Sequence, residues 1–181
     1  MPLSSFIKSW KGSVIRHLPT VPGKQQPDPL NFNYCGKSNE NRWNVNGEPT
    51  LYLASEKDVA LAEFARHFES ARTPALLKQT YKRKVYRFKI ELDYTLDLCN
   101  PSICKQFSLT DAPMCFMDIK IARATANFLR NTTSIQAMFV PSMAFMDDAS
   151  KWCLVIFLEK LQPNYSNFFK EVQPDGYFQI K

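Results

Sequence analysis

One alternating stretch, residues 85–92, constrains the fold of this 181-residue chain more than any other feature of the sequence. Aromatic and aliphatic side chains at the even positions, from Tyr86 to Leu92, alternate with residues that are mostly charged. A period of two places one side of a segment in a core and the other side in water, which predicts a half-exposed β-strand. The pattern continues less evenly through residues 95–98, so we expect the strand to continue there.

Further strand signals are spread over the chain. The turn dipeptide Asn46-Gly47 precedes a run of strand-forming residues, and short apolar runs recur later. The first forty residues hold five prolines, which break long regular elements and leave an apolar patch around Val14-Ile15 as an entry strand. We expect strands at residues 14–15, 50–54, 135–140 and 152–158 and, in the tail, at residues 177–180.

Two segments carry the spacing of amphipathic helices. Ser55 can cap a helix with Asp58 three positions later, and apolar residues then recur at helical intervals until Thr73-Pro74 ends the pattern. Residues 117–130 repeat this spacing, and the prolines and cysteines before them indicate loops and short helical turns. Strand signals outnumber helix signals without regular alternation, so the sequence predicts an α+β fold with mainly antiparallel or mixed sheets.

Length and composition exclude several classes of protein. With 181 residues, of which 45% are hydrophobic and 22% charged, the chain is expected to form a single domain over residues 1–181. The longest apolar run, residues 152–158, is far shorter than the roughly 20 residues that a membrane-spanning helix needs, and the first residues lack a signal-peptide pattern. The five cysteines form no C-x-x-C pair, which favours reduced thiols over disulfides or a zinc site. We therefore expect a cytoplasmic protein without a bound metal.

Charge and missing motifs narrow the function. The formal net charge of +6 favours anionic partners, such as a nucleotide, a nucleic acid or an acidic protein. The sequence contains no G-x-G-x-x-G, no P-loop, no H-E-x-x-H and no G-x-S-x-G. A dinucleotide oxidoreductase, a P-loop kinase, a zinc protease and a serine hydrolase are therefore not supported.

One set of motifs has a recognisable order. Arg42-Trp43-Asn44 precedes the predicted turn, Tyr52 lies on the strand that follows, Glu63 lies on the first predicted helix, and Pro141-Ser142 follows a later apolar run. This order resembles the RES family, bacterial domains named for an arginine, a glutamate and a serine. The resemblance covers residues 14–161, and irregular extensions are expected at both ends.

The resemblance implies a fold and an activity. RES domains are similar in fold to the ADP-ribosyltransferase toxins, and members degrade NAD by breaking the bond between nicotinamide and ribose. Members also act as toxins beside an antitoxin, which we expect here to be a separate protein because we find no helix-turn-helix in this chain. A homodimer is compatible with the family, although no residue specifies one.

Four residues receive direct roles from this resemblance. The carboxylate of Glu63 would stabilise the positive charge that develops on the ribose as nicotinamide leaves. The planar fork of Arg42 would hold the pyrophosphate. Tyr52 would stack on nicotinamide while its hydroxyl orients the substrate, and Ser142 would hydrogen-bond the amide or a phosphate. NAD is then the substrate, no further cofactor is expected, and phosphate or water is the favoured acceptor.

Five further residues are assigned to substrate binding. Arg16 lies on the entry strand and would reach the phosphates, and Ser55 begins a helix whose first N–H groups can hold an anion. Trp43 and Asn44 share the arginine motif, and Trp43 also anchors the loop by packing. His67 lies one helical turn after the glutamate and would orient it.

The residues alone leave other functions open. Helical periodicity places Glu63 opposite the apolar stripe, where it would be a surface carboxylate paired with His67. The same pocket could transfer ADP-ribose to a target protein. Residues 78–87, in which basic side chains alternate with tyrosines, could instead belong to a non-catalytic module that binds nucleic acid or an acidic partner. The resemblance favours NAD turnover and makes nucleic acid the weaker alternative.

Overall fold

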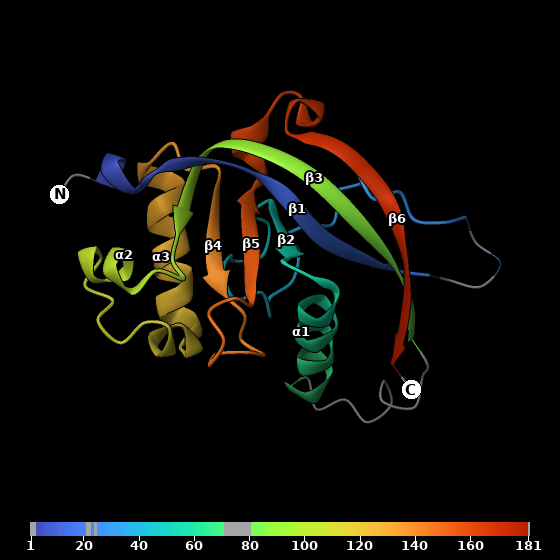
Figure 1. Ribbon diagram of the computed structural model, residues 1–181, viewed down its shortest axis with the longest axis horizontal. Coiled ribbons are helices and arrows are strands. Elements are labelled where there is room, and N and C mark those ends of the chain that lie inside the picture. Colours follow the sequence, from blue (N-terminus) through green and yellow to red (C-terminus); the bar gives the residue numbers. More distant parts are fainter. Residues whose placement is uncertain (1–2, 21–22, 24, 71–80, 181) are drawn as a thin grey trace.

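Two groups of strands cross each other in the computed structural model of this chain (Figure 1). The structure describes residues 3–20, 23, 25–70 and 81–180. Long strands arch over the molecule, and short strands run across their direction. The long strands are β1 (Lys8–Pro19), β3 (Tyr81–Asp97) and β6 (Phe169–Ile180), and the short ones are β2 (Thr50–Ala54), β4 (Ala137–Pro141) and β5 (Trp152–Phe157).

The strand pairing closes the sheet on itself. The order along the sheet is β1-β2-β5-β4-β3-β6, and β1 also pairs with β3, so five strands form a ring and β6 pairs along β3 outside it. The β3–β4 pairing is parallel, with Thr95 beside Ala137, and the other pairings are antiparallel. β1 and β2 meet at the pair Ile15 and Ala54. The predicted α+β fold with a mixed sheet in a single domain is confirmed.

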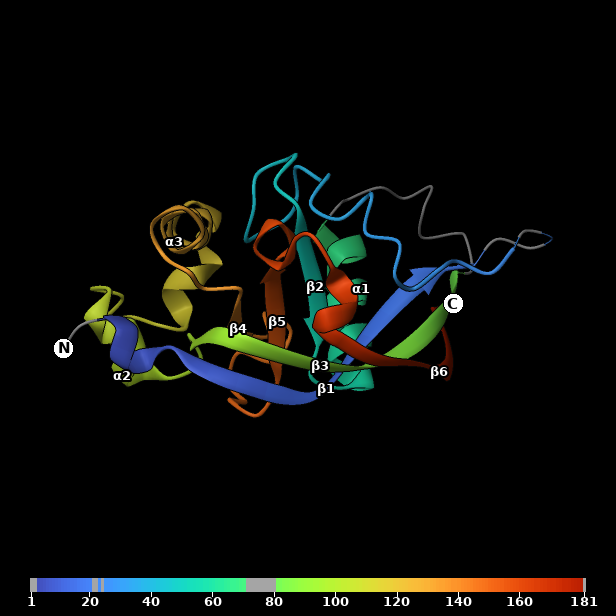
Figure 2. The ribbon, with the colours of Figure 1, turned by 90° about the horizontal axis from the view of Figure 1, so that it is seen from above.

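Helices flank the short strands on both sides (Figure 2). α1 (Lys57–Ser70) begins two residues after Ser55, and its predicted end at Thr73-Pro74 lies outside the described residues. α3 (Ile119–Thr132) begins later than predicted because Asp118 caps it by accepting the Lys120 N–H at 2.8 Å. Among the described helices, none is long and apolar enough to cross a bilayer. The shorter elements are α2 (Pro101–Gln106) and the 3₁₀ helices η1 (Leu3–Phe6), η2 (Met114–Met117), η3 (Leu158–Leu161) and η4 (Tyr165–Asn167).

The layer between the long and the short strands holds one of the hydrophobic cores. Phe88 and Ile90 of β3 are fully buried there and belong to the same cluster as Leu154 of β5. The predicted alternation in β3 is therefore confirmed. Val85 lies on the opposite face of the strand and is nevertheless buried, because α1 covers that end of the sheet through Val59.

β1 and β6 are longer than the sequence predicts. The apolar patch Val14-Ile15 lies inside a strand of 12 residues, and β6 begins at Phe169 rather than at residue 177. Both strands pair with β3, which has 17 residues. A long partner satisfies backbone N–H and C=O groups whatever the local side chains are, so the strand lengths follow from β3 rather than from local patterns.

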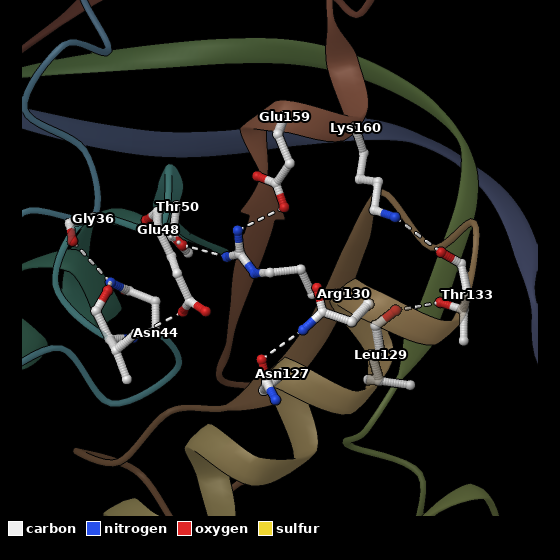
Figure 3. A network of polar contacts seen from close by, with 12 residues as sticks. Gly36, Asn44, Glu48, Thr50, Asn127, Leu129, Arg130, Thr133, Glu159 and Lys160 are labelled. Atoms are coloured by element: carbon white, nitrogen blue, oxygen red, sulfur yellow. Dashed lines mark hydrogen bonds and ion pairs between the residues drawn. The ribbon is translucent and has the colours of Figure 1, made fainter.

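A buried arginine ties α3 to the start of β2 and to η3 (Figure 3). Arg130, in the last turn of α3, donates from Nη1 to Glu159 Oε1 at 2.6 Å and from Nη2 to Thr50 Oγ1 at 2.6 Å. Its guanidinium carbon also lies 4.5 Å from the ring centroid of Phe157. Because Thr50 begins β2, this network fixes the strand that carries Tyr52.

Candidate active site

The structure brings Glu63 and Ser142 into direct contact. Ser142 Oγ donates to Glu63 Oε1 at 2.6 Å, and the Ala144 N–H donates to the same oxygen at 3.0 Å. Ser142 is fully buried just after β4, and Glu63 is half-buried on α1. The interpretation of Glu63 as a solvent-facing carboxylate is therefore wrong. At Glu63 the polar face of α1 turns toward the loop after β4.

The hydroxyl of Tyr52 is occupied by the loop before β2. It accepts a hydrogen bond from the Trp43 N–H at 3.0 Å and donates to Asn44 Oδ1 at 2.8 Å. Burial raises the pKa of Tyr52 well above its ordinary value, so the phenol stays neutral. The hydroxyl positions the Arg42-Trp43-Asn44 loop, and its role in orienting substrate stays a prediction.

Arg42 is held by η2, just before α3 begins. Its Nη1 donates to the carbonyl oxygens of Phe116 at 2.7 Å and Met117 at 3.0 Å. Within the described part of the chain these two carbonyls are its hydrogen-bond acceptors, so the rest of the guanidinium fork is available to a ligand. Burial lowers the pKa of Arg42, and the nearby Arg66 lowers it further, which indicates two cations close together.

Two cavities meet at Glu63 and Tyr52. The first has a volume of about 540 Å³ and lies along β1 and β2, and the second has a volume of about 470 Å³ and lies between α1, the loop before β2 and the start of α3. Both are lined by Asn41, Tyr52, Glu63 and Cys153. Both volumes fall in the range of roughly 300–1,000 Å³ that is usual for small-molecule sites. Glu63 therefore lies between two compartments of one divided site.

Comparison with protein families identifies the chain. The model of the RES domain matches residues 17–173, which is most of the sequence. This chain belongs to the RES domain family. The resemblance deduced from the motifs is thereby confirmed, and the matched region begins slightly later and ends later than the predicted residues 14–161.

A solved structure shares the fold of this RES domain. It is a chain of the crystal structure of the M. tuberculosis MbcT–MbcA toxin–antitoxin complex, with a TM-score of 0.61 and 17% sequence identity. The alignment covers 98% of this chain and 89% of that chain. At this identity the likeness shows a common fold. A search of the curated proteins found no match.

Two residues beside the RES arginine are used by the fold. Trp43 is buried against Phe116, with ring centroids 4.9 Å apart, and it also lines the second cavity. Asn44 is buried too: its Oδ1 accepts from Tyr52, and its Nδ2 donates to the Gly36 carbonyl at 2.9 Å. Both ends of its amide thus serve the loop, and the assignment of Asn44 to substrate binding stays a prediction.

The loop before β2 is also held from α3. Arg123 donates to the carbonyl of Asn41 at 2.7 Å and to that of Asn39 at 2.5 Å. These bonds cross from one RES motif to a helix more than eighty residues away in the chain. The position of Arg42 thus depends on η2 through its own bonds and on α3 through Arg123.

Two other predicted substrate contacts are taken by the protein itself. Arg16 lines the first cavity, yet its guanidinium donates to the carbonyl oxygens of Pro29 and Asn31, the latter at 3.1 Å, and it is 8% exposed. It fixes the loop after β1, and its reach to the phosphates stays a prediction. Ser55 Oγ accepts the Trp152 N–H at 3.4 Å, so it joins β2 to β5.

His67 is the remaining predicted contact. It lies on α1, but its side chain falls outside the described residues, so its role toward Glu63 stays a prediction. Among the residues that the structure describes, no group of three or more His, Cys, Asp or Glu side chains gathers as a metal site.

Sequence patterns missed His17 and Cys153, which line this site. His17 Nδ1 accepts from Arg83 Nε at 2.6 Å, and the imidazole lines the first cavity. Burial and the positive charge of Arg83 lower the pKa of His17 to about 3, so it is neutral and its Nε2 carries the proton. Burial and Glu63 raise the pKa of Cys153, which remains a thiol. A lone residue in a strand carries no periodic signal, so no local pattern distinguishes either side chain.

Proposed function

We propose that this RES domain cleaves the bond between nicotinamide and ribose in NAD. The observation that supports this proposal most directly is the Ser142–Glu63 contact, because it holds one carboxylate at the junction of two cavities. The bond to be cleaved lies between the nicotinamide ring and the rest of the dinucleotide, and a divided site with the carboxylate at the junction can hold one part on each side of it. Family membership is consistent with this activity.

Glu63 acts on the charge that develops during bond cleavage. Nicotinamide leaves with the electron pair of the C1′–N bond, which leaves positive charge on the ribose ring. Both hydrogen bonds that the described residues donate to Glu63 go to Oε1, so we assign Oε2 as the oxygen that faces the ribose. A fixed carboxylate stabilises the cationic transition state more than the neutral sugar, which lowers the barrier.

Arg42 and Arg66 supply positive charge in the second cavity. Both line it, and the effect of Arg66 on the pKa of Arg42 places them near each other. Two guanidinium groups can hold the pyrophosphate of NAD, or a phosphate ion that attacks C1′. We therefore retain phosphate and water as the acceptors, with nicotinamide as the leaving group in both reactions.

The test compares the wild type with two variants on the same helix. Glu63→Gln keeps the shape of the side chain and removes its charge, whereas Asp58→Asn removes an exposed charge in the first turn of α1. Nicotinamide release is followed by proton NMR with and without inorganic phosphate. We expect Glu63→Gln to lose at least about 100-fold in rate and Asp58→Asn to keep the wild-type rate.

Each outcome decides a part of the proposal. Release that requires phosphate indicates phosphorolysis, and release without it indicates hydrolysis. Equal rates in the wild type and in Glu63→Gln would contradict the role of the carboxylate. Labelling of one lysate protein by labelled NAD, without free turnover, would instead identify a protein ADP-ribosyltransferase.

The basic module is the less favoured alternative. Residues 78–80 lie outside the described residues, and the described lysines of this stretch already cover tyrosine rings: Lys82 lies 4.5 Å from the ring centroid of Tyr177, and Lys84 lies 5.4 Å from that of Tyr86. Tyr86 is also buried. These rings are therefore poorly placed to stack on bases.

The biological setting follows as part of the same proposal. The structural neighbour comes from a toxin–antitoxin complex, so we propose a toxin that pairs with a separate antitoxin at the mouth of the site. A cytoplasmic location and a homodimer stay predictions. Co-expression with the product of an adjacent gene, followed by co-purification and loss of NAD turnover, tests the pairing.

A further inference from the structure

A third cavity lies on the opposite side of the short strands from the candidate active site. Its volume is about 420 Å³, and it opens between the long strands and the ends of β4 and β5. Side chains of a strand alternate between its two faces. Val140 and Cys153 line the second cavity, whereas their neighbours Phe139 and Trp152 line this third one. The third cavity is therefore a separate site.

Three aromatic rings form the wall of this cavity. Trp10 of β1 lies 5.2 Å from Phe139 and 6.1 Å from Trp152, and Phe139 lies 5.0 Å from Trp152, measured between ring centroids. The planes of these pairs make angles of 72°, 90° and 84°, so the rings stand nearly perpendicular to one another, like the three sides of a corner. All three are half-buried rather than closed off in the core.

The backbone of β1 favours this placement of Trp10. A Cβ atom at Gly12, two residues along the same face, would lie 2.3 Å from Trp10 Cζ2. The indole therefore lies directly against Gly12, and a side chain at that position would have to displace it.

The faces of these rings carry negative potential, and the edge-to-face contacts within the trio use only part of it. Aromatic faces attract cations within about 6 Å of the ring centroid. Among the described residues, the lysines and arginines that lie over rings use other aromatics, and none lies over Trp10, Phe139 or Trp152. The aromatic corner is therefore available to a cation from outside.

A carboxylate lines the same cavity. Asp97, at the end of β3, accepts the Cys99 N–H on Oδ1 at 2.9 Å, which fixes its orientation. No ion pair joins Asp97 to a basic side chain of the described chain. Lys8 also lines the cavity and is exposed, so its positive charge opposes a cationic ligand from the rim.

We propose that the cavity of Trp10, Phe139, Trp152 and Asp97 binds a small organic cation with a methylated ammonium group. The three rings surround the methyl groups, and the carboxylate balances the charge. A volume of about 420 Å³ accommodates such a molecule. This site is independent of NAD turnover.

The test uses choline and its neutral carbon isostere, 3,3-dimethyl-1-butanol, with the full-length protein. Trp10 and Trp152 are two of the three tryptophans, so their fluorescence reports binding directly, and calorimetry provides a second readout. We expect choline to bind at least about tenfold more tightly than the isostere, because only choline carries the charge that the rings and Asp97 recognise.

Three variants test the charge and the rings: two should weaken choline binding, and the third should strengthen it. Asp97→Asn keeps the acceptor for the Cys99 N–H and removes the charge, so it should weaken choline at least about threefold. Phe139→Leu should weaken choline by a similar factor through the loss of one ring face. Lys8→Met should strengthen choline, because it removes the opposing charge. Absence of choline binding, equal binding of the neutral isostere, or unchanged affinity in Asp97→Asn would each overturn the proposal.

Discussion

The buried Arg130–Glu159 pair allows a quantitative test of how α3 is fixed to the sheet (Figure 3). The Arg130 side chain is 7% exposed and that of Glu159 is 34% exposed, with Nη1 and Oε1 2.6 Å apart. Breaking a fully buried pair by removing one partner costs about 3–5 kcal/mol. Because water reaches the carboxylate, we expect Glu159→Ala to lower the free energy of unfolding by about 2 kcal/mol.

Removing the arginine should cost less than removing its partner. Arg130 Nε is buried without a hydrogen-bond partner among the described residues, so Arg130→Met relieves one desolvated group while its chain still packs on Phe157. Thr50 Oγ1 loses Arg130 but still donates to the Glu48 carbonyl at 3.0 Å. We expect a loss of about 1 kcal/mol for Arg130→Met and little further loss when Glu159→Ala is added.

The assay is urea unfolding at neutral pH, followed by far-UV circular dichroism, with thermal unfolding as a check. A change of about 2 kcal/mol in a chain of this length corresponds to a shift of about 4–8 °C in Tm. Glu91→Ala is the matched control, because its ion pairs with Lys11 and Lys170 are exposed and should contribute nothing measurable. Equal effects at Glu159 and Glu91, or a larger loss for Arg130→Met than for Glu159→Ala, would refute the reasoning.

Three other perturbations test the site and its supports. Tyr52→Phe leaves the Trp43 N–H and Asn44 Oδ1 without their partner, so urea unfolding should show a loss of about 2–3 kcal/mol in the free energy of unfolding. Nicotinamide release should also fall, because the Arg42 loop loosens. Stability and rate equal to those of the wild type would contradict this. Lowering the pH from 6.5 toward 4 should destabilise the wild type more than the His17→Gln variant, by about 2 kcal/mol at pH 4.5. The reason is that the pKa of His17 is about 3 in the folded protein, so between these pH values only the unfolded chain binds the proton. Parallel pH profiles of the two proteins in urea unfolding would exclude this contribution of His17. Gly36→Ala should lower the free energy of unfolding in urea by about 3 kcal/mol, since φ is +82° and the new Cβ would meet the Glu48 carbonyl oxygen at 1.8 Å. Gly47→Ala has a φ of +98° but open space around the new Cβ, so it should lose only about 1 kcal/mol. Similar losses in the two variants would show that the contact with Glu48 is unimportant.

Local patterns were sufficient for the elements whose side chains carry the signal. β2 matches the predicted residues 50–54, β5 lies within the predicted 152–158, and α3 lies within two residues of the predicted 117–130. In each of these, apolar side chains face a core on one or both sides, and burial imposes the period that a sequence shows. β1 and β6 lack such a period over much of their length because β3, not a core, defines them.

The residues of the candidate site were likewise predictable only in part from the sequence. The order of Arg42, Tyr52, Glu63 and Ser142 was sufficient to recognise the family, because chemistry restricts which residue types can stand at those positions. The sequence could not show that Tyr52 and Asn44 bond to each other, since a side chain with hydrogen-bonding groups serves either a ligand or a neighbour.

What the sequence alone determined is the fold class, most of the elements and the residues of the RES motifs. The tertiary structure decided which way Glu63 faces. Helical periodicity places it away from the apolar stripe, and that direction means water only if nothing covers the helix. The loop after β4 does cover it: Ser142 and Ala144, some eighty residues away in the chain, donate to its carboxylate. Contacts between such distant segments depend on how the sheet closes, and no local pattern records that.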